Sequence, residues 1–122
     1  MGDPKKTLVL GASPNETRYA NIAVRRLRAA GHPVVAVGQR QGTIGDVPIQ
    51  QGRPAVEEIH TVTLYLNPEV QKEYLDYVLG LRPRRIIFNP GTENPELQGA
   101  AHAQGIETEL ACTLVMLSVD QY

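Results

Sequence analysis

The chain has 122 residues and a formal net charge of -1, and 42% of its residues are hydrophobic. This length suffices for one domain whose core needs no metal or disulfide. The single cysteine, Cys112, excludes an internal disulfide and fits a reducing cytoplasm. Without a basic excess or a long apolar run, the chain is not typical of nucleic-acid or membrane-binding proteins. We therefore expect a single cytoplasmic domain over residues 1–122, with neither nucleic acid nor membrane as a partner.

Five short runs rich in β-branched residues or leucine predict strands, at residues 7–10, 33–37, 61–66, 85–88 and 106–110. Stretches with helical spacing separate these runs and predict helices over residues 18–31, 68–82 and 95–105. Strands that alternate with helices indicate a parallel sheet covered on both faces. We expect a doubly wound α/β fold with a mainly parallel five-stranded sheet.

Two segments depart from this alternation. Residues 38–58 are rich in glycine, glutamine and proline, and we interpret them as a loop with a short strand at 47–49 and one helical turn at 55–59. Residues 112–119 are apolar, and they fit either a final helix or an extended tail.

The turn after the first strand is the most informative segment. The apolar run ends at Gly11, Ser13 and Asn15 follow, and a helix then begins. A strand, a tight turn and a helix N-terminus together bind phosphate groups through backbone N–H groups and the helix dipole. The usual Gly-x-Gly-x-x-Gly is missing, because no further glycine occurs before Gly31. The turn predicts a phosphate-bearing ligand other than an ordinary dinucleotide, although these polar residues could also simply cap the helix.

The end of the second strand carries an arginine where NAD-binding folds carry an acid. That acid accepts hydrogen bonds from the ribose hydroxyls, but here Gly38 and Arg40 follow the strand and no acid occurs before Asp46. A guanidinium attracts a phosphate through charge-assisted hydrogen bonds. The sequence therefore favours a ligand with a phosphorylated ribose, such as NADP or coenzyme A. The alternative is that Arg40 is only a solvated loop residue.

Ligands of such sheets bind beyond the carboxyl ends of the strands. The loops expected there cover residues 11–17, 38–42, 67–68 and 89–94. The last of them looks like the far wall of the site, although a well-made turn into the next helix explains the same residues.

No convincing catalyst accompanies this site. His32, His60 and His102 fall away from the expected crevice, so we assign them surface or structural roles. Cys112 lies near the end of the fifth strand, yet a lone cysteine beside apolar residues is more often a packed small side chain than a nucleophile. No metal-ligand spacing or nucleophile motif is present either. We expect no catalytic residue and no metal.

Several short motifs occur in a characteristic order. They are Val9-Leu10-Gly11-Ala12-Ser13-Pro14-Asn15, Leu27-x-x-x-Gly31-His32-x-Val34-Val35, Gly45-Asp46-Val47-Pro48-Ile49, Phe88-Asn89-Pro90-Gly91, and Gly105-Ile106-Glu107 ahead of Cys112. Over nearly the whole chain this order resembles the family of stand-alone CoA-binding domain proteins. These are similar to the N-terminal CoA-binding domain of the succinyl-CoA synthetase α subunit, whose ligase domains have no counterpart here.

The resemblance implies a Rossmann-like fold with coenzyme A as its ligand. Gly11, Ser13 and Asn15 would cradle the pyrophosphate, and Arg40 would lie near the phosphorylated ribose. The loops after the third and fourth strands would line a channel for the pantetheine. The implied contact residues are Gly11, Ala12, Ser13, Pro14, Asn15, Gly38, Arg40, Leu66, Asn67, Pro68, Asn89, Pro90 and Gly91.

The sequence leads us to expect a protein that binds coenzyme A or an acyl-CoA without catalysis of its own. One alternative is a small NADP-dependent oxidoreductase, and another is a protein–protein interaction module that has lost its ligand. We also consider a homodimer, because twofold homo-oligomers are common.

Overall fold

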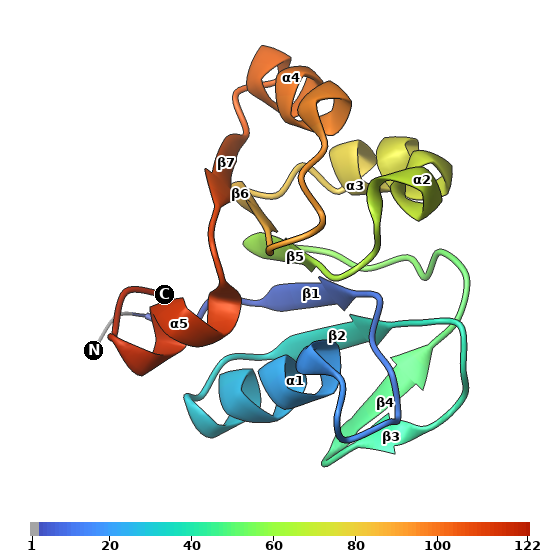
Figure 1. The fold of residues 1–122 in the computed structure, drawn as a ribbon, viewed down its shortest axis with the longest axis vertical. Coiled ribbons are helices and arrows are strands. Elements are labelled where there is room, and N and C mark those ends of the chain that lie inside the picture. The colour runs from blue at the N-terminus through green and yellow to red at the C-terminus, as the bar shows by residue number, and fades with distance from the viewer. Residues whose placement is uncertain (1–2) are drawn as a thin grey trace.

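One sheet with the strand order β3-β4-β2-β1-β5-β6-β7 organises the molecule (Figure 1). The structure, a computed structural model, describes residues 3–122. The parallel centre of the sheet consists of β1 (Thr7–Leu10), β2 (Val34–Val37), β5 (Thr61–Leu64), β6 (Arg85–Phe88) and β7 (Glu107–Leu110). These are the five predicted parallel strands. In register, Leu10 lies between Val37 and Leu64, so the carboxyl ends of these strands meet at one edge.

The prediction of five strands is wrong, because two short strands extend the sheet beyond β2. β3 (Thr43–Ile44) and β4 (Val47–Gln50) form a hairpin, and β4 pairs parallel with β2. Buried and exposed residues alternate along β4, which is the period of a half-buried strand. The predicted short strand is thus confirmed as β4, but as part of the sheet.

The predicted helical turn at residues 55–59 is also wrong. The segment runs from β4 to β5 without helical hydrogen bonding. Glu58 adopts a φ of 57°, which is outside the right-handed helical region. Val56 and Ile59 still pack on the core, so the apolar spacing reflects packing of an irregular connection.

The helices are α1 (Tyr19–Ala29), α2 (Pro68–Gln71), the 3-10 turn η1 (Lys72–Tyr74), α3 (Leu75–Gly80), α4 (Pro95–Ala103) and α5 (Thr113–Ser118). The predicted second helix is therefore three short pieces. Asn67 begins this region, because its Oδ1 accepts the Val70 N–H at 3.0 Å and Pro68 then occupies the first helical position. Residues 112–119 form α5 over most of their length, so the helical alternative is confirmed there.

Two cores lie on opposite faces of the sheet. Successive residues of a strand point to opposite sides, so Leu8 and Leu10 pack in a core with residues of α3 and α4, whereas Val9 packs with residues of α1. Leu117 of α5 joins the α1 side. Among residues 3–122, none of the helices is long and apolar enough to cross a membrane.

Candidate functional site

A cavity of about 720 Å³ opens at the carboxyl edge of the sheet. Residues that follow β1, β2, β5 and β6 line it, as expected for the ligand crevice of a parallel sheet. The cavity brings together most of the residues expected from the sequence, namely Gly11, Ala12, Ser13, Asn15, Gly38, Arg40, Leu66, Asn67, Pro90 and Gly91.

The first turn is held tightly against its neighbours. Gly11 has a φ of 101°, which favours glycine, and a Cβ there would lie 3.0 Å from the carbonyl carbon of Tyr65. The N–H groups of Gly11 and Ala12 both donate to the Val37 carbonyl at 2.9 Å. These two N–H groups therefore fix the turn to β2 and are not available to a phosphate, contrary to the role expected for Gly11.

The N-terminus of α1, which follows the first turn in the chain, can still bind an anion. Asn15 Oδ1 accepts from the N–H and hydroxyl of Thr17, and Ser13 Oγ accepts from the Asn15 N–H, so these side chains order the loop and do not cap α1. The N-cap of α1 is Arg18, which makes no side-chain capping bond, and the first turn holds no acid. An uncapped N-terminus of an eleven-residue helix leaves N–H donors and the positive end of the dipole facing this end of the site.

Gly38 lets the end of β2 approach the first turn. A Cβ at Gly38 would lie 2.1 Å from the Ala12 carbonyl oxygen, closer than any two such atoms can come. This close approach explains why a glycine follows β2 directly. It also brings Arg40, two residues later, to the cavity wall.

Arg40 is exposed and lines the cavity. The next acid in the sequence, Asp46, is paired instead with Arg28, at 2.8 Å between Nη2 and Oδ2. The hydrogen bond from the Arg28 guanidinium lowers the pKa of Asp46, so this carboxylate stays ionised and occupied. Within residues 3–122, no ion pair involves Arg40.

The opposite wall consists of the loops after β5 and β6. Gln71 is 1% exposed, and its Nε2 donates to the carbonyls of Leu66 and Thr92, both at 2.8 Å. Its Oε1 accepts from Asn94 Nδ2 at 3.0 Å. Gln71 therefore holds the two loops together from behind, a role that its place in an apparently ordinary helix did not indicate.

Three residues expected at the ligand do not line the cavity. Pro14 packs against Gly42, and Pro68 is the first residue of α2. The Asn89 side chain is buried: Nδ2 donates to Thr63 Oγ1 and the Leu64 carbonyl, and Oδ1 accepts the Thr113 N–H at 2.9 Å. Because all of these bonds are internal, Asn89 positions the loop and the start of α5, and it does not line the cavity.

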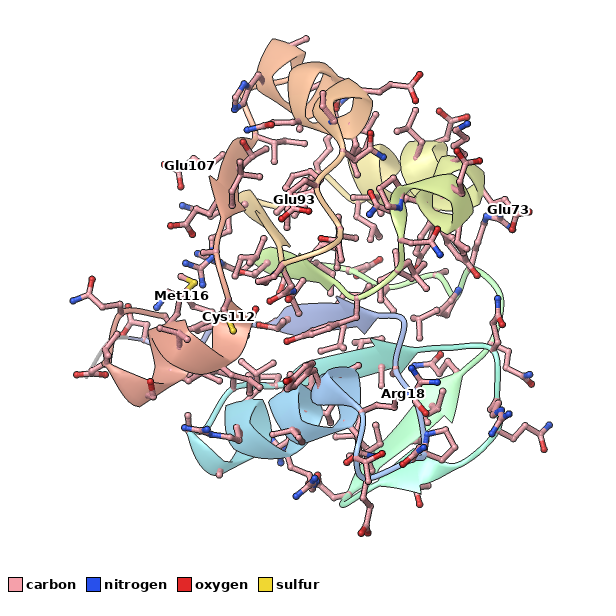
Figure 2. All side chains as sticks on the ribbon, viewed as in Figure 1. Arg18, Glu73, Glu93, Glu107, Cys112 and Met116 are labelled. Atoms are coloured by element: carbon pink, nitrogen blue, oxygen red, sulfur yellow. The ribbon has the colours of Figure 1, made fainter. Side chains whose placement is uncertain are left out.

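Other cavity residues were not foreseen, among them Arg18, Tyr19, Tyr65 and Tyr74. Arg18 lies beside the loop between β1 and α1 (Figure 2). The predicted third strand was two residues too long, which hid Tyr65 inside it; in the structure Tyr65 follows β5, and burial raises its pKa to about 12. Tyr74 belongs to η1, and the Arg53 guanidinium lies 4.9 Å from its ring.

None of the histidines lines the cavity. His32 Nδ1 accepts the Lys5 N–H, His60 Nδ1 lies 2.8 Å from Thr61 Oγ1, and His102 Nε2 lies 2.8 Å from Thr108 Oγ1. Cys112 is the N-cap residue of α5 and is also outside the cavity lining (Figure 2). In the described part of the chain, no group of three histidine, cysteine or acidic residues could hold a metal.

Comparisons with known proteins place this geometry in a family. A protein of known structure, described only as uncharacterized, is 46% identical, with a TM-score of 0.96 and coverage of 99% of this chain and 100% of that one. Two others are each 24% identical and share the fold. One is from Thermus thermophilus, with a TM-score of 0.82 and coverage of 98% of this chain and 91% of that chain. The other is a hypothetical protein from Pyrococcus horikoshii, with a TM-score of 0.84 and coverage of 95% and 83%. No protein of curated function matches the sequence.

A family model described as a CoA binding domain matches residues 5–118. The match covers every strand and helix of the structure. The chain therefore belongs to the CoA-binding domain family.

Proposed function

We propose that this protein binds coenzyme A or an acyl-CoA in the cavity at the carboxyl edge of the sheet, without catalysing a reaction itself. One observation carries the proposal beyond the family description. The uncapped N-terminus of α1 and the guanidinium of Arg40, which has no ion pair within residues 3–122, both face one cavity. Apart from Arg18 beside that N-terminus, the other residues of the cavity wall are uncharged. Two separate places for phosphate groups suit a ligand with a pyrophosphate and a phosphorylated ribose.

Each part of the cavity then has a role. Ser13 and the first N–H groups of α1 bind the pyrophosphate, and Arg40 binds the ribose phosphate. The pantetheine lies between the loops at Leu66–Asn67 and Pro90–Thr92, which Gln71 holds together. A neutral channel suits this part of the ligand, because the pantetheine arm carries amides and no charge.

NADP also carries a ribose phosphate, so Arg40 alone does not separate the two ligands. The first turn distinguishes coenzyme A from NADP, because it lacks the additional glycines of dinucleotide-binding folds. In those folds the glycines let the backbone come close to the pyrophosphate and let the helix pack closely on the strand. A module that binds a protein partner only would need neither group. Ligand-dependent stability distinguishes the three possibilities.

The test measures thermal unfolding with coenzyme A, dephospho-CoA, NAD and NADP at equal concentrations. A ligand at a hundred times its dissociation constant stabilises the native state by about 2.7 kcal/mol. Coenzyme A should stabilise more than dephospho-CoA, and both should stabilise more than either nicotinamide dinucleotide. A larger effect of NADP would support the oxidoreductase, and no effect of any CoA species would support the interaction module.

A further inference from the structure

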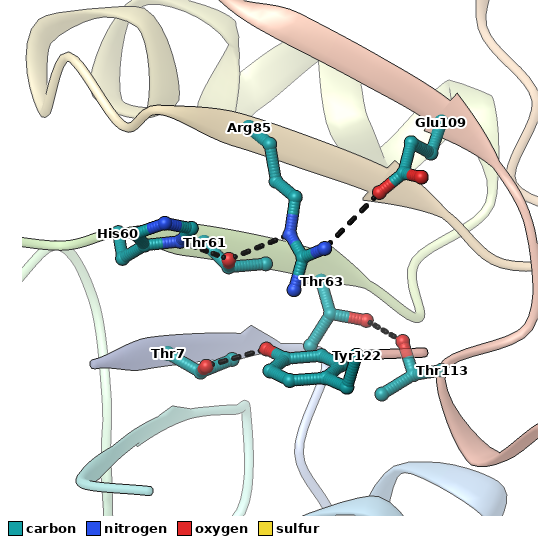
Figure 3. Close-up of polar contacts among 8 residues, drawn as sticks. All are labelled: Thr7, His60, Thr61, Thr63, Arg85, Glu109, Thr113 and Tyr122. Carbon is teal, nitrogen blue, oxygen red and sulfur yellow. Dashed lines mark hydrogen bonds and ion pairs between the residues drawn. The ribbon is translucent and has the colours of Figure 1, made fainter. Parts of the chain in front are cut away.

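The amino edge of the sheet, opposite the cavity of the proposed function, contains a second polar cluster (Figure 3). Its centre is Arg85, the first residue of β6, whose side chain is 9% exposed. Arg85 Nε donates to Thr61 Oγ1 at 2.9 Å, and Nη1 donates to Glu109 Oε2 at 3.2 Å. Nη2 is buried and has no hydrogen-bond acceptor. Within residues 3–122 it is the only buried side-chain nitrogen or oxygen without a hydrogen-bond partner. A buried donor without a partner costs free energy and calls for an unseen partner such as an ion or water.

Tyr122 covers this guanidinium. Its ring centroid lies 4.4 Å from Arg85 Cζ and 5.0 Å from the His32 ring, and its hydroxyl lies 2.5 Å from Thr7 Oγ1. The ring face attracts the positive charge of the guanidinium. It supplies no oxygen or nitrogen acceptor, so Nη2 is left without one.

A second cavity, of about 480 Å³, adjoins Tyr122 and contains further donors. Lys5 and His32 line it. Because His32 Nδ1 accepts the Lys5 N–H, the neutral imidazole carries its proton on Nε2, where it can donate. The His32 ring and the Arg85 guanidinium thus contact the Tyr122 ring, and Lys5 lines the cavity beside it.

We propose that this edge is a second binding site, for a compact oxyanion of the phosphate type, and that Tyr122 is its displaceable cover. With the ring moved aside, an oxyanion would accept from Arg85 Nη2. The Thr7 hydroxyl donates to the Lys5 carbonyl at 2.9 Å and accepts from the Tyr122 hydroxyl, so it offers the anion no proton. His32 and Lys5 would face the same anion from the cavity side. The site is independent of the coenzyme A proposal, because its residues lie at the other end of the strands.

Negative groups nearby limit the affinity. Glu109 holds Arg85 Nη1, Asp120 lines the second cavity, and the C-terminal end of α1 points to this edge with its partial negative charge. Attraction must therefore come from the three cationic or donor side chains. For this reason Glu109→Gln, which removes the competing carboxylate, should tighten binding.

The test is a titration with inorganic phosphate at constant ionic strength, with chloride as the reference salt, read from NMR signals of the His32 ring and the Arg85 side chain. The proteins all carry Arg40→Ala, which weakens phosphate binding at the other edge. Tyr122→Phe removes only the Thr7 hydrogen bond and should tighten phosphate severalfold, and Tyr122→Ala should tighten it further. Adding Arg85→Gln should reverse the gain by about tenfold, the usual value of one charge-assisted hydrogen bond.

Phosphate-dependent shifts at His32 and Arg85 that follow this order support the site. If phosphate leaves both signals unmoved in the Tyr122→Phe protein, a water molecule satisfies Nη2 and the proposal is overturned. Equal affinity with and without Arg85→Gln also overturns it. Coenzyme A titrations of the same Tyr122 variants, made with Arg40 intact, should match wild type, so failure of one proposal does not imply failure of the other.

Discussion

The two edges of the sheet treat their polar groups in opposite ways. At the amino edge, two Arg85 nitrogens bond to Thr61 and Glu109, and Tyr122 packs over the Arg85 guanidinium. At the carboxyl edge, Arg40 is exposed and has no ion pair within residues 3–122, and the N-terminus of α1 has no side-chain cap. Exposed polar groups without internal partners are directly available to a ligand, whereas Arg85 Nη2 is buried under Tyr122 and becomes available only when the ring moves.

At the carboxyl edge, the cavity wall that faces the ligand is supported from behind by close packing and by internal hydrogen bonds. Gly11, Gly38 and Asn89 serve the fold, and Ser13 and Arg40 are free to serve a ligand. The comparison therefore predicts that substitutions behind the wall lower stability, and that substitutions on the wall lower affinity.

Gly38→Ala should have the largest effect. Its Cβ would lie 2.1 Å from the Ala12 carbonyl oxygen, a backbone atom that cannot turn away. The first turn and the end of β2 must then separate, and we expect a loss of about 3 kcal/mol in the free energy of unfolding, measured with denaturant.

Gly99→Ala is the matched control. Gly99 lies in α4, and a Cβ there would meet no atom within 4 Å. Alanine is the better helix former, so this variant should gain about 0.5–1 kcal/mol. Equal stabilities of the two variants would show that β2 and the first turn do not depend on their close approach.

Asn89→Ala should come next. It leaves the Thr113 N–H and the Leu64 carbonyl without their partner inside the protein. We expect a loss of about 2–3 kcal/mol in the free energy of unfolding, since each buried unsatisfied group costs about 1–3 kcal/mol. The dissociation constant for coenzyme A, measured calorimetrically on the folded fraction, should change little. A large loss of affinity with normal stability would instead show that Asn89 contacts the ligand.

The contrast between Asn89 and Arg40 also indicates how far the sequence could lead. Strand runs, helix starts and the crevice edge followed from apolar periodicity and from residues such as Gly31 and Pro68. That information located the loops at the carboxyl edge correctly. It missed β3 as a strand, because two residues carry too short a pattern to recognise.

Within the loops, residue type alone did not reveal which way a side chain points. Asn89 and Asn67 both follow a strand, yet Asn89 is 3% exposed and bonds inward, whereas Asn67 lines the cavity. Gln71 and Tyr74 lie at the ends of α2 and η1, where the predicted second helix is interrupted. Helical spacing in the sequence does not predict this interruption. The cluster around Arg85 brings together residues far apart in the sequence, such as Thr7 and Tyr122, so only the tertiary structure reveals it.

Arg40→Ala should affect binding without affecting stability. An exposed arginine without an ion pair adds little to folding. Its loss should weaken coenzyme A by about tenfold, the value of one charge-assisted hydrogen bond, and leave dephospho-CoA nearly unchanged. Arg26→Ala, at an exposed position near the end of α1, is the control and should alter neither affinity. An equal loss for both ligands would assign Arg40 to the pyrophosphate.

The smallest effect concerns pH and belongs to the amino edge. Burial, followed by the charges of Lys5 and Arg85, lowers the pKa of His32 below 6.5, and burial and Arg85 do the same for His60. The unfolded chain therefore binds more protons than the native state as the pH falls. The stability that comes from keeping these rings neutral is complete above pH 6.5 and is lost as the pH falls through the lowered values.

Denaturant unfolding of the wild type and of the His32→Gln, His60→Gln double variant, compared between about pH 7 and pH 5, isolates this contribution. The wild type should lose more stability than the double variant over that range, because carboxylates titrate in both proteins and the two rings only in one. Among the described residues, no histidine or carboxylate lines the cavity at the carboxyl edge. The ribose phosphate of coenzyme A itself titrates at about pH 6, so the affinity is measured with dephospho-CoA, and per folded molecule it should be far less sensitive to pH than stability is. If stability and affinity instead fell together with the same midpoint, the two edges would be coupled through the sheet, and their treatment as independent edges would be wrong.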